Sequence, residues 1–263
     1  MPAAPDPVVI TFEDVTKRFE RPDGSGVFTA VDRLSFRVTR GEIVAVLGKT
    51  GCGKSTIFNL IAGLAEPTSG RIAVDGQDPF GAFAALRGKI GIVFQGDRLM
   101  PWRTALDNVL LGFEILGVER GRARKIAQDW LARLGLAGHE NDYPHALSGG
   151  MRQRVSIARA LSVDPTLILC DEPFSALDEM TARRLRAEFL RLVRDSAKTA
   201  LFVTHSIDEA LEVGDRIMVL QRPARIAFEA KVGGEIAPDR KAMLRSEIMK
   251  VLAGDDQSDG GVD

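Results

Sequence analysis

The segment that most constrains the fold is GKTGCGKST, which follows the apolar run EIVAVL and precedes the apolar segment IFNLIAGL. A Gly-x-x-x-x-Gly-Lys-Ser pattern between a strand and a helix is the context of a phosphate-binding loop. Its glycines let backbone N–H groups close around the β- and γ-phosphates, while Lys54 supplies a positive charge and Ser55 offers a hydroxyl to Mg²⁺. The sequence therefore predicts a nucleotide site at Gly48, Lys49, Thr50, Gly51, Cys52, Gly53, Lys54, Ser55 and Thr56.

Hydrophobic patterning predicts that strands alternate with helices around this loop. Strand–helix alternation favours a parallel sheet that is covered on both faces. From about Thr104 to Leu161 the pattern is helical, so this stretch is expected to be a helical insert. The expected strands are Val8–Phe12, Leu34–Val38, Ile43–Leu47, Arg71–Val74, Ile90–Phe94, Leu167–Cys170, Ala200–Thr204 and Arg216–Leu220.

A second site is expected where the buried run LILC ends in Asp171 and Glu172. Asp171 can reach Mg²⁺ through a water molecule, and Glu172 can orient or deprotonate an attacking water. Adjacent residues of an extended strand point to opposite faces, so the two acids need not share one role. Without the upstream loop, such a pair would more often be a solvated strand end.

A second anion-binding feature lies in HALSGGMRQRV, where Ser148-Gly149-Gly150 begins a basic helix. The first N–H groups of a helix attract an anion, and two glycines leave room for it to approach closely. The simpler alternative is that Ser148 only caps the helix. One nucleotide needs one phosphate-binding loop, so these residues alone leave open which anion the second feature binds.

Charge and cysteine content restrict the class of protein. The 35 Lys and Arg residues balance the 36 Asp and Glu residues, so nucleic acid is not an expected partner. The two cysteines, Cys52 and Cys170, give no disulfide framework and favour a reducing compartment. The N-terminus lacks the pattern of a signal peptide, and the apolar runs are too short to span a bilayer, so we expect a soluble, cytoplasmic protein.

These motifs, in this order, resemble the ATP-binding subunits of ABC transporters: GKTGCGKST, Gln95, LSGGM, LILCDEP, SALD ending at Asp178, and His205. The resemblance implies a P-loop NTPase (RecA-like) α/β core with an antiparallel β subdomain and an inserted helical subdomain. The corresponding ATPase domain covers residues 1–226. It is composed of the β subdomain and P-loop core at 1–95, a helical signature subdomain at 96–161 and the rest of the core at 162–226. A C-terminal extension at 227–253 and a disordered tail at 254–263 follow.

The resemblance also implies roles for single residues. The catalytic set is Glu172, His205, Gln95 and Lys54, in which Gln95 coordinates Mg²⁺ or the lytic water and His205 contacts the γ-phosphate. Mg²⁺ ligands are Ser55, Gln95 and Asp171. The loop and Asp178 bind ATP, and Phe19 stacks on its adenine. Ser148, Gly149 and Gly150 bind the ATP of a partner subunit. Phe19 can instead be a core residue, because Phe12, Phe28 and Phe36 are close in sequence.

Two positions depart from the family pattern, and two segments indicate a subfamily. Met151 replaces the usual Gln of the signature, and Ser206 replaces a common Asp; neither removes a phosphate ligand.

The subfamily is indicated by two segments, Val93–Val109 and His205–Ile226. They resemble the corresponding segments of importers of nitrate, sulfonates, taurine and related solutes. The apolar stretch Leu99–Trp102 suits a short helix of a membrane partner, unless Trp102 packs onto the helical insert.

The resemblance implies a second copy of the chain or a homologous ATPase subunit, a transmembrane permease and, indirectly, a solute-binding protein, with the chain at the cytoplasmic face of the inner membrane. Alternatives are a soluble ABC-type ATPase without a permease and a non-hydrolysing ATP-dependent interaction module; a P-loop kinase would leave LSGGM and SALD unexplained. Near the C-terminus, Asp239–Leu252 is expected to be a helix with an apolar stripe of Met243, Leu244, Ile248 and Leu252.

Overall fold

The computed structural model describes residues 7–21, 23–233 and 237–254. It divides into two compact units, one formed by residues 1–86 with 199–263 and the other by residues 87–198. Each unit is described by itself below. The tail expected to be disordered lies, apart from Gly254, outside the described residues.

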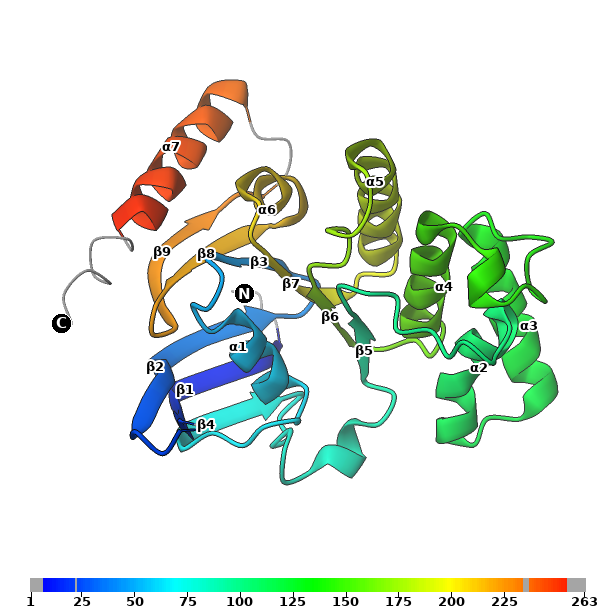
Figure 1. The fold of residues 1–263 in the computed structure, drawn as a ribbon, viewed down its shortest axis with the longest axis horizontal. Helices are drawn as coiled ribbons and strands as arrows, with labels where there is room; N and C mark the ends of the chain where they lie inside the picture. Colours follow the sequence, from blue (N-terminus) through cyan, green and yellow to red (C-terminus); the bar gives the residue numbers. More distant parts are fainter. Residues whose placement is uncertain (1–6, 22, 234–236, 255–263) are drawn as a thin grey trace, which may run out of the picture. The chain divides into compact units, whose positions relative to one another are not determined.

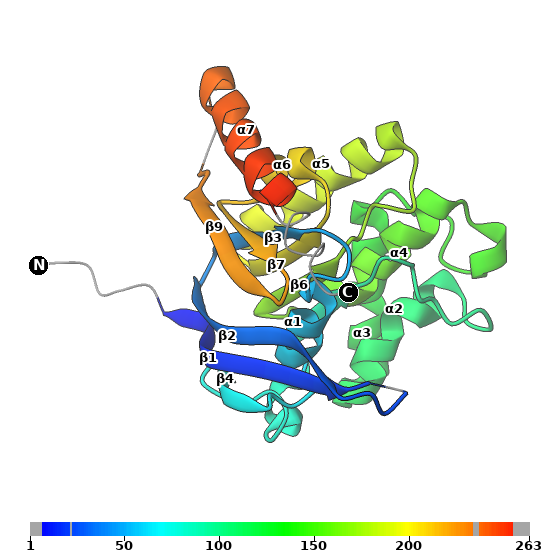
Figure 2. The ribbon, with the colours of Figure 1, turned by 60° about the vertical axis from the view of Figure 1, so that its left-hand side comes forward.

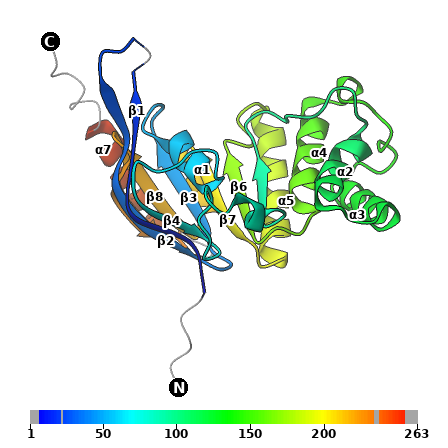
Figure 3. The same ribbon diagram turned by 90° about the horizontal axis from the view of Figure 1, so that it is seen from below.

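An antiparallel sheet forms one part of the first unit (Figure 3). Its order is β2 (Val27–Thr39), β1 (Val8–Glu20) and β4 (Ser69–Val74). Phe12 and Phe36 lie opposite each other on β1 and β2, and their rings stack at 4.5 Å in the core of this sheet. The strands are longer than the sequence indicates, because β1 and β2 continue past their apolar ends as a hairpin, and residues 21 and 23–26 between them are exposed.

A second sheet of the same unit carries the phosphate-binding loop (Figure 1). Three strands run parallel, in the order β7 (Thr199–Thr204), β3 (Ile43–Gly48) and β8 (Arg216–Gln221). Every residue of β3 is buried, which explains its continuous apolar sequence. A further strand, β9 (Arg225–Lys231), pairs antiparallel with β8, so the sheet is mixed rather than purely parallel.

The described residues of the first unit also form the helical segments α1 (Lys54–Ile61), the short 3₁₀ turn η1 (Phe83–Leu86), α6 (Ile207–Val213) and α7 (Pro238–Gly254). The predicted C-terminal helix is therefore present, and it packs on α6, β8 and β9. Figure 2 shows it beside α6 and β9. Leu244 and Ile248 are buried, whereas Met243 is 58% exposed. The expected four-residue stripe was thus wrong at Met243. Gln221 Nε2 donates to the carbonyl oxygen of Val251 at 2.9 Å and fixes α7 to β8.

The second unit combines a parallel strand pair with helices. The strands are β5 (Ile90–Val93) and β6 (Leu167–Asp171), and the helices are α2 (Ala105–Leu116), α3 (Arg120–Arg133), the short η2 (Pro144–Ala146), α4 (Gly149–Leu161) and α5 (Glu179–Asp195). Helix α4 packs against α2, α3, α5 and β5, so it connects the helical part of this unit with its strands. Its buried residues include Val155, Ile157 and Ala158.

Local sequence explains where these helices begin and end. Thr104 caps α2 by accepting from the N–H of Asp107 at 3.1 Å, and Gly117 ends the helix at a φ of 68°. Small residues form the buried face of α3, with Ala123, Ala127 and Leu131 inside. Trp130 is half-buried and has the Arg133 guanidinium over its ring at 5.4 Å. Within the described part of the chain, no helix has both the length and the apolar character needed to cross a membrane.

Candidate nucleotide-binding site

The phosphate-binding loop has a conformation that requires glycine at two positions. A Cβ at Gly48 would lie 2.5 Å from Cys52 Sγ and 2.9 Å from the carbonyl oxygen of Leu220. Gly53 has a φ of +105°, and a Cβ there would lie 2.6 Å from the carbonyl oxygen of Ala30. The loop is thus packed closely against β8 at Gly48 and against β2 at Gly53. Gly51 is different, because it has a φ of +81° but open space around it.

Lys54 lies across the loop. It is 7% exposed, and its Nζ donates to the carbonyl oxygens of Gly48 at 2.6 Å and Lys49 at 2.8 Å. The ammonium group is therefore held against the backbone of the loop. Thr50 and Ser55 are exposed, Lys49 and Thr56 are half-buried, and Cys52 is buried toward Gly48.

A hollow of about 450 Å³ joins the loop to two residues that are distant in sequence. It is lined by Gly48, Lys49, Thr50, His205 and Leu252. His205 follows the carboxyl end of β7, beside the carboxyl end of β3, so the parallel pairing of these strands brings it to the loop. Leu252 comes from α7, and sequence reasoning did not place it here because nothing in the helix pattern says which strand ends it reaches.

Phe19 is not a core residue. It is 36% exposed on β1, and its ring stacks on Phe28 of β2 at 5.5 Å. Lys17 also approaches this ring, with its Nζ 4.9 Å from the centroid and hydrogen-bonded to the carbonyl oxygen of Glu66 at 2.7 Å. The exposed pair Phe19–Phe28 therefore contrasts with the buried pair Phe12–Phe36 further along the same two strands. An exposed aromatic surface of this kind can stack on a base.

Asp171 and Glu172 lie in the second unit. Asp171 is the last residue of β6, but Glu172 has left the strand and has a φ of 45°. The expectation that both acids continue an extended strand was therefore wrong for Glu172. A left-handed conformation at a non-glycine residue costs on the order of 1–3 kcal/mol, and such strain is concentrated at functional sites. The turn is closed by Ser175, whose N–H and Oγ donate to the carbonyl oxygen of Glu172 at 3.2 and 3.0 Å.

The same unit carries Gln95 and the start of α4. Gln95 is exposed and lies two residues beyond the end of β5. Ser148 caps α4 by accepting from the N–H of Met151 at 3.3 Å, so the capping role is real. Gly149 is not required by packing, since a Cβ there would meet nothing closer than 3.8 Å. A Cβ at Gly150 would be 3.1 Å from Thr181 Cγ2.

Asp178 caps helix α5 of this unit. Its Oδ1 accepts from the N–H of Thr181 at 3.0 Å. The hydrogen bonds from the backbone and side chain of Thr181 hold the pKa of Asp178 below its ordinary value. A carboxylate in this position is ionised and fixed, and its structural partner is the helix start.

The two departures from the family pattern also have local explanations. Ser206 caps α6, with its Oγ accepting from the N–H of Glu209 at 3.3 Å, so it performs the capping that an Asp would perform. Met151 is half-buried in the first turn of α4, and its backbone N–H serves the cap at Ser148. Neither side chain leaves the helix start without a cap.

The segment after Gln95 presents Trp102 to solvent. Trp102 is 71% exposed, so it does not pack onto the helical insert, and that alternative was wrong. Buried Asn108 shapes the segment: its Oδ1 accepts from the N–H of Met100 at 2.8 Å, and its Nδ2 donates to the carbonyl oxygen of Arg103 at 3.1 Å. A large apolar side chain held outward on a fixed loop is suited to a partner surface.

Sequence reasoning missed three side chains of α4 that contact the segment around Gln95. Arg152 Nε donates to Asp97 Oδ2 at 2.8 Å, and Arg159 Nη1 donates to the carbonyl oxygen of Arg98 at 2.8 Å. Burial lowers the pKa of Arg159, against the opposing effect of the Asp97 charge. The third side chain of α4 that contacts this segment is that of Gln153. The spacing of Arg152 and Arg159, seven residues apart on one helix face, was the available signal.

The donors present suit a magnesium ion. No group of three or more His, Cys, Asp or Glu side chains placed to hold a metal occurs among residues 7–21, 23–233 and 237–254. Mg²⁺ is commonly bound by one or two protein oxygens together with phosphates and waters. The hydroxyl of Ser55, the amide of Gln95 and the carboxylate of Asp171 are oxygen donors of this kind, and the first two are exposed.

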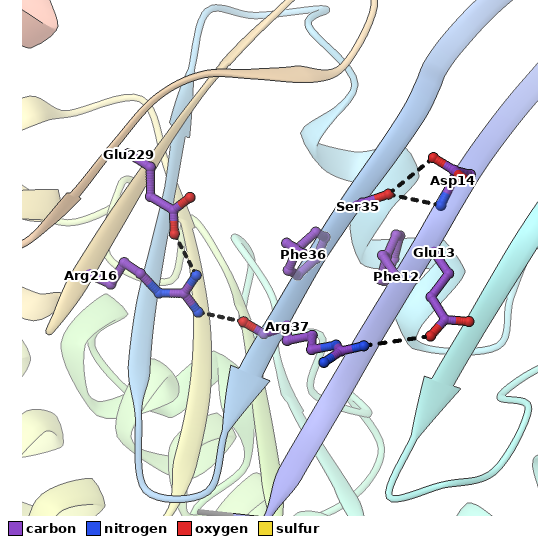
Figure 4. Close-up of a pocket in the computed structure, with 8 residues that line it drawn as sticks. All are labelled: Phe12, Glu13, Asp14, Ser35, Phe36, Arg37, Arg216 and Glu229. Carbon is purple, nitrogen blue, oxygen red and sulfur yellow. Dashed lines mark hydrogen bonds and ion pairs between the residues drawn. The ribbon is translucent and has the colours of Figure 1, made fainter. Parts of the chain in front are cut away.

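A second hollow of about 530 Å³ lies in the first unit, away from the loop residues (Figure 4). Its charged side chains already have polar partners. Arg216 Nη1 donates to Glu229 Oε1 at 2.6 Å, and Arg37 Nη2 lies 3.9 Å from Glu13 Oε1. Asp14 Oδ1 accepts from Ser35 Oγ at 3.3 Å.

Comparison with known proteins identifies the family. The sequence profile of the family described as "ABC transporter" matches residues 31–175. An uncharacterized ABC transporter ATP-binding protein of Methanocaldococcus jannaschii is 42% identical, over 93% of this chain and 91% of its own length. The taurine import ATP-binding protein TauB of Burkholderia thailandensis is 43% identical over 76% of each protein.

Two further comparisons bear on length and on assembly. The Fe(3+) ions import ATP-binding protein FbpC of Brucella abortus is 44% identical over 82% of this chain, but the match spans only 59% of FbpC. A solved structure, the dimeric post-hydrolysis state of the ATP-binding cassette MJ0796 bound to ADP and Pi, superposes with a TM-score of 0.76. It is 34% identical, and the match covers 86% of this chain and all of that one. The chain belongs to the ABC transporter family and is one of its ATP-binding ATPase cassettes.

Proposed function

We propose that this chain is the ATP-hydrolysing subunit of an importer, and that ATP-driven closure of two subunits is coupled to a transmembrane permease at the cytoplasmic face of the inner membrane. Relatives named for import support the direction of transport. The solute is proposed to be nitrate, a sulfonate, taurine or a related small anion, supported by the likeness to TauB. A solute-binding protein would deliver it to the permease.

The observation that carries the two-subunit proposal is Gly149. Neither its backbone nor its surroundings require glycine, because a Cβ would meet only ordinary contacts at 3.8 Å. The absence of a side chain at a helix N-terminus is useful when a ligand held elsewhere must approach the N–H groups closely. We assign that ligand as the γ-phosphate held by the loop of a second copy, contacted by Ser148, Gly149 and Gly150. The dimeric state of MJ0796 with ADP and Pi supports this assignment.

In the proposed reaction, Lys54, Glu172 and His205 act on the nucleotide that is held by the loop of their own chain. Lys54 binds the β- and γ-phosphates, Glu172 orients or deprotonates the attacking water, and His205 contacts the γ-phosphate and positions that water. Mg²⁺, when bound by Ser55, Gln95 and Asp171, supplies positive charge to the phosphates. Phe19 stacks on adenine, and Asp178 contributes by fixing the start of α5. One preorganised donor in such a site is typically worth about 3–4 kcal/mol of the activation barrier.

The first test is ATP hydrolysis by the purified chain across a wide range of protein concentration, with Glu172→Gln in parallel. We expect specific activity that rises with concentration, because two copies build the site, and loss of turnover with retained ATP binding in the variant. Size-exclusion chromatography would show whether a flat concentration dependence reflects a preformed dimer. A monomer that hydrolyses ATP would overturn the two-subunit proposal, and normal turnover of Glu172→Gln would remove Glu172 from its role.

The solute requires a separate test in cells. Disruption of the gene should reduce uptake of labelled taurine, an alkanesulfonate or nitrate, and the wild-type gene should restore it, whereas Lys54→Ala should not. Loss of Fe³⁺ uptake with normal uptake of the other three solutes would instead support the activity named for FbpC. No uptake defect for any solute would favour a soluble ABC-type ATPase.

A further inference from the structure

Gln153 of α4 contacts two catalytic segments at once. Its side chain is 4% exposed, and its Nε2 donates to the carbonyl oxygen of Pro173 at 2.6 Å and to that of Phe94 at 3.4 Å. Pro173 directly follows Glu172, and Phe94 directly precedes Gln95. A single buried amide therefore connects the turn after β6 with the segment after β5.

The backbone at Glu172 needs such support. Its φ of 45° is unfavourable for a residue with a side chain, and the following proline further restricts it. Strained conformations persist only where surrounding contacts fix them. Ser175 holds the carbonyl oxygen of Glu172, and Gln153 holds the next carbonyl oxygen along the chain, so the two peptide groups on the C-terminal side of Glu172 are both fixed.

The segment around Gln95 is fixed by the same helix. Besides the weaker bond from Gln153 to Phe94, Arg152 and Arg159 bind Asp97 and the carbonyl oxygen of Arg98. All of these side chains project from α4, whose N-cap is Ser148 and whose first residues are Gly149 and Gly150. A displacement at the start of α4 would therefore move Gln153 and both segments that it contacts.

We infer that Gln153 is a positioning residue that places Glu172 for catalysis. It also keeps the position of Gln95 fixed relative to Glu172, and it connects both residues to contacts made at the start of α4. Gln153 touches neither nucleotide nor water in this role. The inference rests on the proposed function, because it requires Glu172 to be the residue that acts on the attacking water.

The test uses Gln153→Met, which has similar size but cannot donate a hydrogen bond. Gln221→Met is the matched control, because Gln221 also donates one side-chain amide bond to a backbone carbonyl oxygen, at 2.9 Å, but it joins β8 to α7. Both full-length variants are assayed for kcat and KM of ATP hydrolysis and for the midpoint of thermal unfolding. Glu172→Gln is measured alongside.

For Gln153→Met we expect kcat to fall at least about tenfold while KM for ATP changes less than about twofold, the pattern of a lost transition-state interaction. Gln221→Met should keep wild-type kcat even if its unfolding midpoint drops. A lowered midpoint of Gln153→Met with wild-type kcat would overturn the inference and leave a structural role.

If Gln153→Met does not fold, a second variant replaces it. Gln153→Asn keeps the amide but is too short to reach both carbonyls, so it should show the same loss of kcat, and wild-type kcat there would overturn the inference. Wild-type turnover of Glu172→Gln would mean that the proposed function has failed, whereas an inactive Glu172→Gln beside a fully active Gln153→Met would mean that only this inference has failed.

Discussion

Arg216 holds Glu42 through two hydrogen bonds, from Nε to Oε1 at 2.6 Å and from Nη2 to Oε2 at 3.0 Å. Arg216 also binds Glu229 and the carbonyl oxygen of Arg37 (Figure 4). Glu42 immediately precedes β3, and Arg216 begins β8, so the pair fixes the amino-terminal ends of two strands that lead toward the nucleotide loop. Two-point binding between an arginine and a carboxylate is among the stronger polar contacts in proteins.

This pair predicts a pH-dependent loss of stability. Burial tends to raise the pKa of Glu42, but the hydrogen bonds from Arg216 and Thr39 and the charge of Arg216 outweigh it, so the folded-state pKa lies below the ordinary value of 4.5. The stabilisation is therefore complete above that ordinary value and disappears as pH falls through the lower folded-state pKa. At pH 7, Glu42→Gln should lower the free energy of unfolding by about 2 kcal/mol.

Urea unfolding of wild type and Glu42→Gln between about pH 7 and about pH 3 measures this effect. The difference between the two proteins should shrink toward the acid end, since protonation removes the same charge that the variant removes. A difference that stays constant over the range would mean that the ionised pair contributes nothing and that packing explains the loss.

Phe19→Ala should weaken ATP binding by about 1–3 kcal/mol, the range of stacking between a base and an aromatic ring. Isothermal titration calorimetry with a non-hydrolysable ATP analogue measures this change in binding free energy. Phe28→Ala is the informative comparison, because it removes the ring stacked on Phe19 at 5.5 Å but leaves Phe19 in place; its loss should be smaller. Unchanged affinity of Phe19→Ala would remove this residue from the adenine site.

The loop and the strand that ends at Asp171 could be predicted from sequence because each depends on local pattern, but the turn at Glu172 could not. The segment from Gly48 to Ser55 lies between an apolar strand and a helix, and that order alone predicts its conformation. His205 could be assigned only through the family resemblance. The structure adds a physical reason, since β7 and β3 are parallel neighbours and their carboxyl ends lie together.

Other features depend on contacts between distant residues and leave little trace in a single sequence. The left-handed backbone at Glu172 is maintained by contacts from Ser175 and Gln153, and no local pattern encodes it. Strand β9 alternates intermediate and exposed residues as the last strand of its sheet, so its apolar signal is weak. Met243 matched the apolar periodicity of α7 but lies outside the narrow face formed by Leu244 and Ile248.

Trp102→Ala should uncouple transport from hydrolysis. The side chain is 71% exposed, so its removal leaves no cavity, and basal ATPase activity should stay within about twofold of wild type. Solute uptake and the stimulation of hydrolysis by the permease in proteoliposomes should be lost, because the surface that we propose for contact with the permease loses its largest apolar side chain. Loss of basal hydrolysis in the isolated subunit would point to folding instead.

Ile248→Ala tests whether α7 is part of the core of the first unit. Ile248 is fully buried, and truncation of such a residue costs about 2–5 kcal/mol. Met243→Ala is the control on the same helix, and its effect should stay within about 0.5 kcal/mol because the side chain faces solvent. Urea unfolding measures both. If α7 is an appendage that detaches by itself, hydrogen exchange in 238–254 will accelerate in Ile248→Ala while the global free energy of unfolding stays at the wild-type value. The packing of α7 on α6, β8 and β9 favours a lower global free energy of unfolding in Ile248→Ala, because we expect a helix that contacts three elements to unfold together with them.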